Sequence, residues 1–299
     1  MLLPKLASLT KPLCLLCSFL LLLNSCQQNT GDTAETQASV TDTITTNEAE
    51  TDTKAEDVQA VQAEPSQTLA ENFPEDQMIQ FTDEGLNGLC GHKYGCVEQQ
   101  ITPLGWSPDG KFAYFLEEAN EAVQNTTIHF VIQDLATDEI VEQQTFKASE
   151  QAGYSEETDN YTVLTVWKQQ EASYREMLER HNVKLGQGTT LLLLGDLAES
   201  IPFTFSSRDK MRKNELFAIK EVDQHWLVAA NEKGGEKRIA QQYMGKYDLV
   251  LKTKPLGGFV SPFEERVAVL EGLEKRGYEG PPNVLRLQIV GCDLSKGFE

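Results

Sequence analysis

Two short stretches of this chain share one pattern, and together they restrict the possible fold more than any other feature of the sequence. The first is GWSPDGKFAYFLEE, residues 105–118, and the second is VSPFEERVAVLE, residues 260–271. Each begins with a Ser-Pro turn that leads into apolar residues. Because Pro presets φ and Gly accepts a positive φ, such a segment predicts a tight turn followed by a β-strand.

Both copies continue in the same way. An acidic, turn-prone segment comes next, and a second strand then closes on an Asp-Leu pair. This second strand is TTIHFVIQDL, residues 126–135, in the first copy and LRLQIVGCDL, residues 285–294, in the second. Turn, strand, loop and strand in this order describe a β-hairpin. The sequence therefore predicts a structure that contains two related antiparallel hairpins.

Further strand-like runs, rich in Val, Ile, Leu and aromatic residues, lie between Gly, Pro, Asn and Asp. The apolar run LLLLGD, residues 191–196, predicts a strand that is buried on both faces. The strands are expected at 112–116, 127–134, 189–194, 215–220, 225–230, 247–251, 266–270 and 284–290.

One prominent helix is expected within residues 159–186, with Asp159 as its N-cap and Gly186 as its C-terminal stop. Apolar or aromatic residues recur there at helical spacing, and such a stripe packs on a sheet. These residues are Val163, Trp167, Tyr174, Leu178 and His181. Strands and helix together predict an α+β fold that is mostly antiparallel β.

The segment WSPDGKFAY resembles part of the repeats of periplasmic β-propellers. A propeller needs at least four blades of about 40 residues or more. The two copies found here, with a helix between them, depart from that pattern, so the resemblance implies propeller-blade-like hairpins within one antiparallel assembly. The chain is also similar to uncharacterised bacterial lipoproteins that carry GWSPDGKFAY, EGPPN and VGCDL, here residues 105–114, 279–283 and 290–294. That resemblance brings no activity with it.

The N-terminal segment MLLPKLASLTKPLCLLCSFLLLLNSC, residues 1–26, is typical of a secretory signal. Lys5 and Lys11 precede an apolar run that is too short to span a bilayer. LNSC, residues 23–26, resembles the lipobox of bacterial lipoproteins, which implies cleavage before Cys26 and lipidation of its thiol. An ordinary cleaved signal peptide or an uncleaved anchor is the alternative.

Lipidation would attach the protein to a membrane of the bacterial cell envelope. Gln27 and Gln28 follow the cysteine, and no aspartate does. Under the sorting rule of enteric bacteria this implies the outer membrane, with the chain facing the periplasm or the cell surface.

Residues 27–75 contain eleven acidic residues and one basic residue, Lys54. Such a segment cannot bury enough apolar surface to offset its ordering entropy, so a disordered acidic tether is expected there. The globular, β-rich domain is expected at 76–299. The formal net charge of -20 opposes binding to phosphate backbones, which argues against a nucleic-acid partner.

The expected domain has three cysteines. CGHKYGC, residues 90–96, can close a disulfide between Cys90 and Cys96 in an oxidising compartment. Pairings with Cys292, or free thiols, are the alternatives. Cys90, His92, Cys96 and Cys292 also have the ligand types of a zinc site, although their spacing matches no standard zinc pattern.

Motifs of known catalysts are absent from the sequence: there is no G-x-S-x-G elbow, HExxH helix, P-loop or dinucleotide-binding fingerprint. Asp196, His181 and His225 are the first candidates for catalysis, and acidic pairs such as 117–118 could hold calcium. The sequence favours a non-enzymatic binding or scaffold domain with an envelope partner and no cofactor. An envelope hydrolase, or another enzyme with a site built from loops, is the alternative.

Overall fold

The computed structural model describes residues 79, 81–82, 84–91, 93–119, 125–155 and 159–299, all within one compact unit, residues 64–299. The expected signal peptide with Cys26, the expected tether and His92 lie outside the described residues. The described strands are β1 (Cys96–Glu98), β2 (Gln100–Trp106), β3 (Lys111–Glu117), β4 (Thr127–Asp134), β5 (Glu139–Lys147), β6 (Lys184–Leu185), β7 (Leu192–Leu193), β8 (Phe203–Asn214), β9 (Ile219–Asn231), β10 (Glu236–Tyr243), β11 (Val250–Val260), β12 (Arg266–Lys275) and β13 (Asn283–Asp293). The helices are α1 (Val163–Arg180), α2 (Leu194–Ser200) and the short 3-10 helix η3 (Ala148–Glu150).

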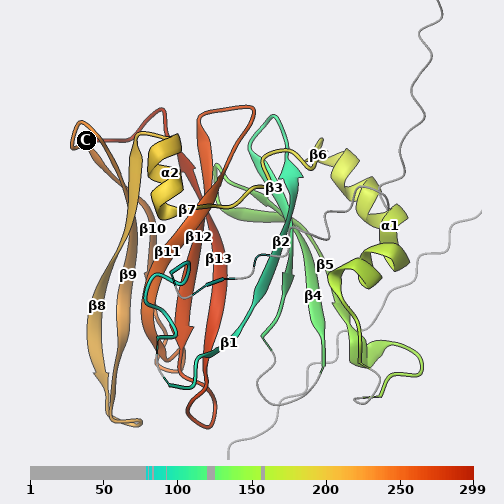
Figure 1. Cartoon of the computed structure of the whole chain (residues 1–299), viewed down its shortest axis with the longest axis horizontal. Coiled ribbons are helices and arrows are strands. Elements are labelled where there is room, and N and C mark those ends of the chain that lie inside the picture. The colour runs from blue at the N-terminus through green and yellow to red at the C-terminus, as the bar shows by residue number, and fades with distance from the viewer. Residues whose placement is uncertain (1–78, 80, 83, 92, 120–124, 156–158) are drawn as a thin grey trace, which may run out of the picture. The chain divides into compact units, whose positions relative to one another are not determined.

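The strands form three sheets, and the prediction of a mostly antiparallel β domain is confirmed. Sheet A has the order β1-β13-β12-β11-β7, sheet B the order β5-β4-β3-β2-β6, and sheet C the order β10-β9-β8. Helix α1 covers one face of sheet B, sheets B and A pack face to face, and sheet C covers the other face of sheet A (Figure 1). No propeller is detected in the described part of the chain.

The alternation of side chains along each strand explains the layers. In β3, Ala113 and Phe115 pack against α1, while Phe112 and Tyr114 point at sheet A. β12 follows the same rule: Ala268 and Leu270 face sheet B, while Val267 and Val269 face sheet C. Since both faces of sheets A and B are covered, these strands are apolar on both sides.

The duplication is longer in the structure than in the two stretches singled out above. β2-β3-β4 and β11-β12-β13 are equivalent three-stranded units, and each carries a Pro-Leu-Gly segment with a β-bulge in its first strand, at 103–105 and 255–257. The edge of each unit pairs with a two-residue strand, β6 or β7. A Cβ at Gly105 or Gly257 would lie 2.1 or 2.3 Å from a carbonyl of that strand, so only glycine admits it.

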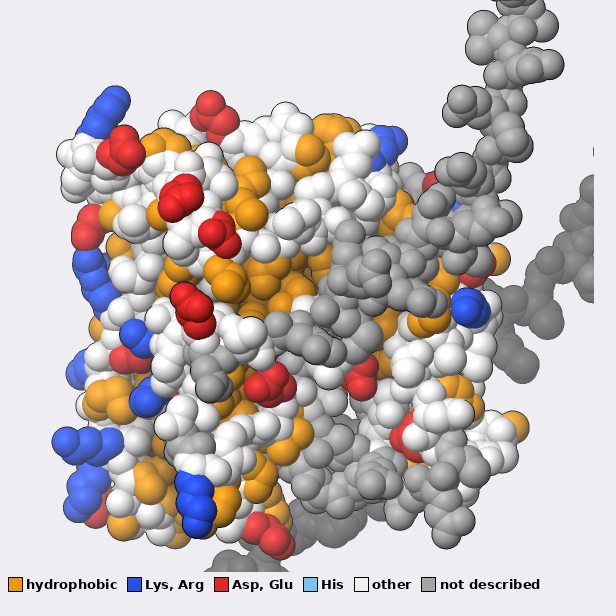
Figure 2. All heavy atoms as spheres, viewed as in Figure 1, with side chains coloured by type: hydrophobic (Ala, Val, Ile, Leu, Met, Phe, Trp, Pro, Cys, Tyr) orange, Lys and Arg blue, Asp and Glu red, His pale blue; other side chains and the backbone are white. Residues whose placement is uncertain are grey.

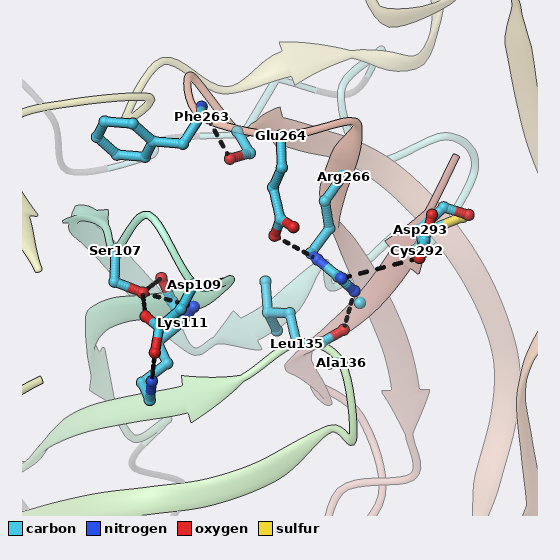
Figure 3. Close-up of polar contacts among 12 residues, drawn as sticks. Ser107, Asp109, Lys111, Leu135, Ala136, Phe263, Glu264, Arg266, Cys292 and Asp293 are labelled. Carbon is cyan, nitrogen blue, oxygen red and sulfur yellow. Dashed lines mark hydrogen bonds and ion pairs between the residues drawn. The ribbon is translucent and has the colours of Figure 1, made fainter. Parts of the chain in front are cut away.

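The two Ser-Pro turns lie next to each other, where the copies meet (Figure 3). In the first copy Ser107 Oγ donates to Asp109, and Lys111 also pairs with Asp109. In the second copy the equivalent cation is Arg266, which bonds Glu264 at 2.6 Å and donates to the Leu135 carbonyl at 2.8 Å. Arg266 of the second copy thus satisfies the Leu135 carbonyl in the exit turn of the first copy. This bond links sheets A and B.

Helix α1 occupies the expected segment, but its ends differ from the prediction. The N-cap is Thr162, whose side chain accepts from the Thr165 N–H, and not Asp159. Asp159 instead accepts from the Thr126 N–H at 2.8 Å. The helix ends at Arg180, and the left-handed residue that follows it is Asn182, whereas Gly186, the expected stop, lies beyond β6. Asp159 and Thr162 are both residue types that cap helices, and the bond from the Thr126 N–H engages Asp159 outside the helix.

Three expected strands are largely wrong, and the first is 247–251, of which only Val250 and Leu251 belong to a strand, β11. Residues 215–220 lie largely in the turn between β8 and β9, and only Ile219 and Lys220 belong to a strand. Of 189–194, only Leu192 and Leu193 pair, because α2 begins at Leu194 and packs on sheet A through Leu197. A short apolar run does not by itself distinguish a buried strand from a buried helix.

Charge is unevenly distributed over the described unit. Residues 203–246, which form sheet C, contain nine Lys and Arg against six Asp and Glu, although the whole chain carries -20. Figure 2 shows Lys and Arg gathered on the side where Figure 1 places β8 and β9. Sheet C is therefore a basic layer on an acidic protein. No helix in the described residues is long and apolar enough to cross a membrane.

Candidate functional site

The candidate site is a groove along one edge of sheet A, which we call the β13 groove. β1 pairs in parallel with only Asn283–Leu285, so the rest of β13 has no strand neighbour on that side among the described residues. The groove has a volume of about 470 Å³. Its floor is β13 at 287–290, one wall is sheet B with Gln133 and Ile140, and the other wall is β10 at 239–242.

Side chains of residues in sheet B, or directly next to its strands, satisfy most of the backbone groups along this edge of the groove. Gln99 Oε1 accepts from the Leu287 N–H at 2.8 Å, and Gln133 Nε2 donates to the Ile289 carbonyl at 3.1 Å. Asp138 Oδ1 accepts from the Gly291 N–H at 2.7 Å. An edge occupied in this way does not offer the long row of free groups that leads to indiscriminate strand pairing.

On the floor of the groove, one pair of backbone groups is left open. The backbone N–H and C=O groups of even-numbered residues of β13 point at β12, as the bond from the Leu294 N–H to the Glu265 carbonyl shows. The backbone groups of odd-numbered residues therefore point into the groove. The Leu287 carbonyl and the Ile289 N–H lie between the satisfied groups, and no described residue bonds either of them. In parallel pairing, a single residue of an added strand bonds two such groups with its own N–H and C=O.

The groove continues beyond Leu287 and Gln288 into a second hollow of about 350 Å³. That hollow shares Lys275, Arg286, Glu118 and other residues with a third one of about 200 Å³, which Tyr247 and Tyr278 also line. Charged groups therefore gather at the end of the groove where β13 begins, whereas the residues that line the other end are mostly amides and aliphatic side chains, with Asp138 as the one charged residue among them.

A chain of buried polar groups leads from the groove wall into the interface of sheets A and C. Gln242 Nε2 donates to Gln288 Oε1 at 2.9 Å, and Gln288 Nε2 donates to Glu271 Oε2 at 2.6 Å. Glu271 is 0% exposed, and its other oxygen lies 2.8 Å from His225 Nε2. Ser207 Oγ also donates to Glu271. The groove is thus connected to a buried imidazole through two side chains.

His225 lies between two carboxylates. Its Nδ1 is 2.8 Å from Asp209 Oδ1, and Thr253 Oγ1 donates to the same Asp209 oxygen at 2.9 Å. The contact of Nε2 with Glu271 has the distance of an ion pair, but its direction departs from that of a hydrogen bond. Burial by itself lowers the pKa of His225, but Asp209 and Glu271 outweigh burial and raise the pKa to about 9. At neutral pH the group is an imidazolium that links β8, β9 and β12.

The three catalytic candidates from the sequence do not come together. His225 is 0% exposed between sheets A and C, so substrate has no access to it. His181 caps the end of α1 and contacts Glu142 of β5 at 3.1 Å, on the opposite side of sheet B from sheet A. Asp196 is exposed in the first turn of α2. Its expected place after a buried strand was wrong, since α2 has already begun there.

The cysteines are arranged as one disulfide and one thiol. Cys90 and Cys96 are joined, which removes both sulfurs from the zinc alternative, and the described residues contain no cluster that could hold a metal. Cys292 is free and buried, and burial raises the pKa of its thiol to about 12. A thiol that remains protonated is a poor nucleophile and a poor metal ligand.

Sequence reasoning found His225 but missed its partners and the groove. The register of β8 and β9 places Asp209 opposite His225, and the packing of sheet A on sheet C brings Glu271 of β12 to it. Gln133, Gln242 and Gln288 had no sequence signal, although a polar residue inside an otherwise apolar strand such as 127–134 is an indication of a specific buried contact.

Comparison with known proteins gives no family model that matches this chain, no significant match among curated proteins, and no significant match among solved structures.

Proposed function

We propose that this chain is a lipid-anchored cell-envelope protein whose folded domain binds a partner rather than catalysing a reaction. The ligand is an extended polypeptide segment of an envelope protein, and the binding site is the β13 groove. One observation carries the proposal: the Leu287 carbonyl and the Ile289 N–H form an open pair on the floor of a groove, between two sheets that serve as walls. Addition of a strand to a sheet edge is a recurring mode of peptide recognition.

The walls suit such a ligand. The amides of Gln133, Gln242 and Gln288 are hydrogen-bonded within the protein and fix the polar part of the walls. Ile140 and Ile239 present apolar surface to alternate side chains of an extended segment. Side chains of the flanking sheets would set which sequences fit, as pockets beside an added strand do. The stacked three-stranded copies are, in this proposal, blade-like units that build a rigid frame around the groove.

Support for the envelope location comes from two separate parts of the chain. The lipobox-like residues 23–26 follow an apolar signal, and the folded unit contains the Cys90–Cys96 disulfide. Disulfides persist in oxidising compartments outside the cytoplasm. The hydrolase alternative has less support: His225 is buried between its carboxylate partners, and of the His129–Glu118 pair only the carboxylate is among the residues that line the hollows described above.

Replacing the cysteine of the lipobox tests the anchor. Cys26→Ala should move the protein from the membrane fraction to the soluble fraction, because the acyl chains supply the membrane affinity. Fractionation of native cells followed by immunoblotting measures this, with Cys292→Ala as the matched control, which should stay with the membrane. A Cys26→Ala protein that sediments with the membrane would rule out lipid anchoring at this residue.

Site-specific photo-crosslinking tests the groove. A photoreactive phenylalanine analogue at Ile140, which is 54% exposed and lines the groove, should form an adduct with a polypeptide partner in native cells. The same analogue at the neighbouring Val141, which is 39% exposed and does not line the groove, should not. Mass spectrometry of the adduct identifies the partner segment.

A second change makes the result specific to the groove. Ala240→Trp on the β10 wall should reduce the Ile140 adduct at least tenfold, because the indole fills the space of the ligand. Equal adducts from positions 140 and 141, or none from either, would count against the proposal.

A further inference from the structure

We infer that the β13 groove selects polypeptide segments by charge and direction: the bound segment runs parallel to β13, with acidic residues in its N-terminal half. This inference rests on the proposed function and adds to it the class of ligand. Three observations carry it: the gathering of cations at one end of the groove, the engagement of the acidic groups there, and the position of the open backbone pair.

The cationic end is the third hollow, of about 200 Å³, where β13 begins. Lys275, Arg276 and Arg286 line it, and Lys246 lies beside it, with its ammonium 5.6 Å from the Tyr247 ring centroid. This cluster stands out on a chain of net charge -20. The rest of this acidic protein repels an acidic ligand, so attraction is confined to the cationic site. A short acidic motif is therefore favoured over a uniformly acidic partner.

The acidic side chains of this hollow already have partners. Glu118 Oε1 lies 2.9 Å from His129 Nε2, and Asp248 Oδ2 accepts from the Gly245 N–H at 2.5 Å. Arg286 is exposed, and no described residue forms an ion pair with it. Its guanidinium can therefore bond a ligand carboxylate with two parallel N–H donors, the arrangement in which arginine binds carboxylates best.

Two tyrosines border the same hollow. Tyr247 is 72% exposed and Tyr278 is 84% exposed, and both line it. Exposed aromatic residues beside arginine are enriched where proteins bind one another, because their rings cover apolar atoms while their hydroxyls hydrogen-bond. They can pack on the methylene groups of a bound Glu, whose carboxylate then reaches the cations.

The open backbone pair determines the direction. The Leu287 N–H and the Ile289 carbonyl are taken by Gln99 and Gln133, which leaves the Leu287 carbonyl and the Ile289 N–H. A parallel segment satisfies both with one residue, whereas an antiparallel segment needs two residues. β1 already pairs with β13 in parallel and leaves the sheet at Glu98, so a parallel segment continues in its place. The N-terminal half of that segment then lies at Arg286, and its C-terminal half lies toward Val290 and Asp138.

Selection from a peptide library tests this directly. The full chain, purified in detergent and immobilised, is used to enrich random ten-residue peptides displayed on phage. Asp and Glu should be enriched in the N-terminal half of the selected peptides and not in the C-terminal half. Arg286→Glu should lower the recovery of these peptides at least tenfold. Lys168→Glu on the exposed face of α1 makes the same change in net charge and should leave recovery unchanged.

The outcomes separate this inference from the function on which it rests. Acidic enrichment in the C-terminal half would overturn the direction, and selected peptides without a charge pattern would overturn the role of the cations. In both cases an adduct from Ile140 would still support the groove as a binding site. A library that enriches no peptide overturns the inference, and if position 140 also forms no adduct, the proposed function fails with it.

Discussion

Raising the pH from 6 to 9 is expected to lower the free energy of unfolding of this protein by up to about 3 kcal/mol, through the loss of one proton from His225. The pKa of His225 is about 9 in the folded protein against an ordinary value of 6.5. A raised pKa means that the folded state holds the proton more tightly than the unfolded state. The stabilisation is therefore complete below pH 6.5 and disappears as the pH rises through 9.

The physical cause is the position of the imidazolium between Asp209 and Glu271. Once His225 is neutral, two carboxylates face each other across sheets A and C with no positive charge between them. His225→Ala produces the same situation at every pH and should cost about 3–5 kcal/mol, the usual effect of removing one partner from a buried ion pair. It should also remove the pH dependence described above.

Urea unfolding of the full chain at pH 6, 7, 8 and 9 measures both effects. Glu271→Gln is a milder companion variant, because it removes one of the two charges that raise the pKa of His225 while keeping the bond to Gln288 within reach. Its pH dependence should be smaller than that of the natural protein. If the natural protein and His225→Ala show the same slope between pH 6 and 9, the imidazolium does not link the sheets.

Trp167→Ala is expected to lower the free energy of unfolding by about 3–5 kcal/mol, the cost of emptying a large buried aromatic site. Trp167 is 0% exposed and holds α1 on sheet B. Its ring lies edge-on to Phe115 at 6.1 Å between centroids and stacks on Tyr174 at 5.6 Å. Such aromatic pairs contribute beyond the area that they bury.

Urea unfolding again provides the measurement, with Lys168→Ala on the exposed face of the same helix as control. The control should change the free energy of unfolding by less than about 0.5 kcal/mol, as exposed substitutions usually do. Because Trp167 is far from the titrating cluster, its variant should keep the pH slope of the natural protein. A loss below about 1 kcal/mol for Trp167→Ala would show that α1 contributes little to the core.

The core elements of the fold were accessible from the sequence because their side chains repeat at a regular period. β4 occupies the expected 127–134, and β12 and β13 include the expected 266–270 and 284–290. Polar strands were missed: β5 and β10 alternate between exposed and partly buried positions and contain Glu, Gln, Lys and Arg. They are strands because they pair with an apolar neighbour, and that pairing leaves no local signal.

The candidate site was much less accessible, because no element contains it. The sequence named His225 but offered Asp196 and His181 as its companions, and both lie elsewhere. Asp209 and Glu271 meet His225 because β8, β9 and β12 have a particular register and sheets A and C pack face to face. A shift of one residue in β9 would turn His225 to the outer face of sheet C.

By itself, then, the sequence determined the repeated hairpin, the amphipathic helix and the apolar cores, since each depends on the period of side chains along a local segment. The tertiary structure decided the groove. It exists because β1 leaves sheet A at Glu98 to begin β2, so that sheet A ends one strand short between sheets B and C. Where a strand leaves a sheet depends on the balance of contacts among three layers, and that balance is set by residues far apart in the chain.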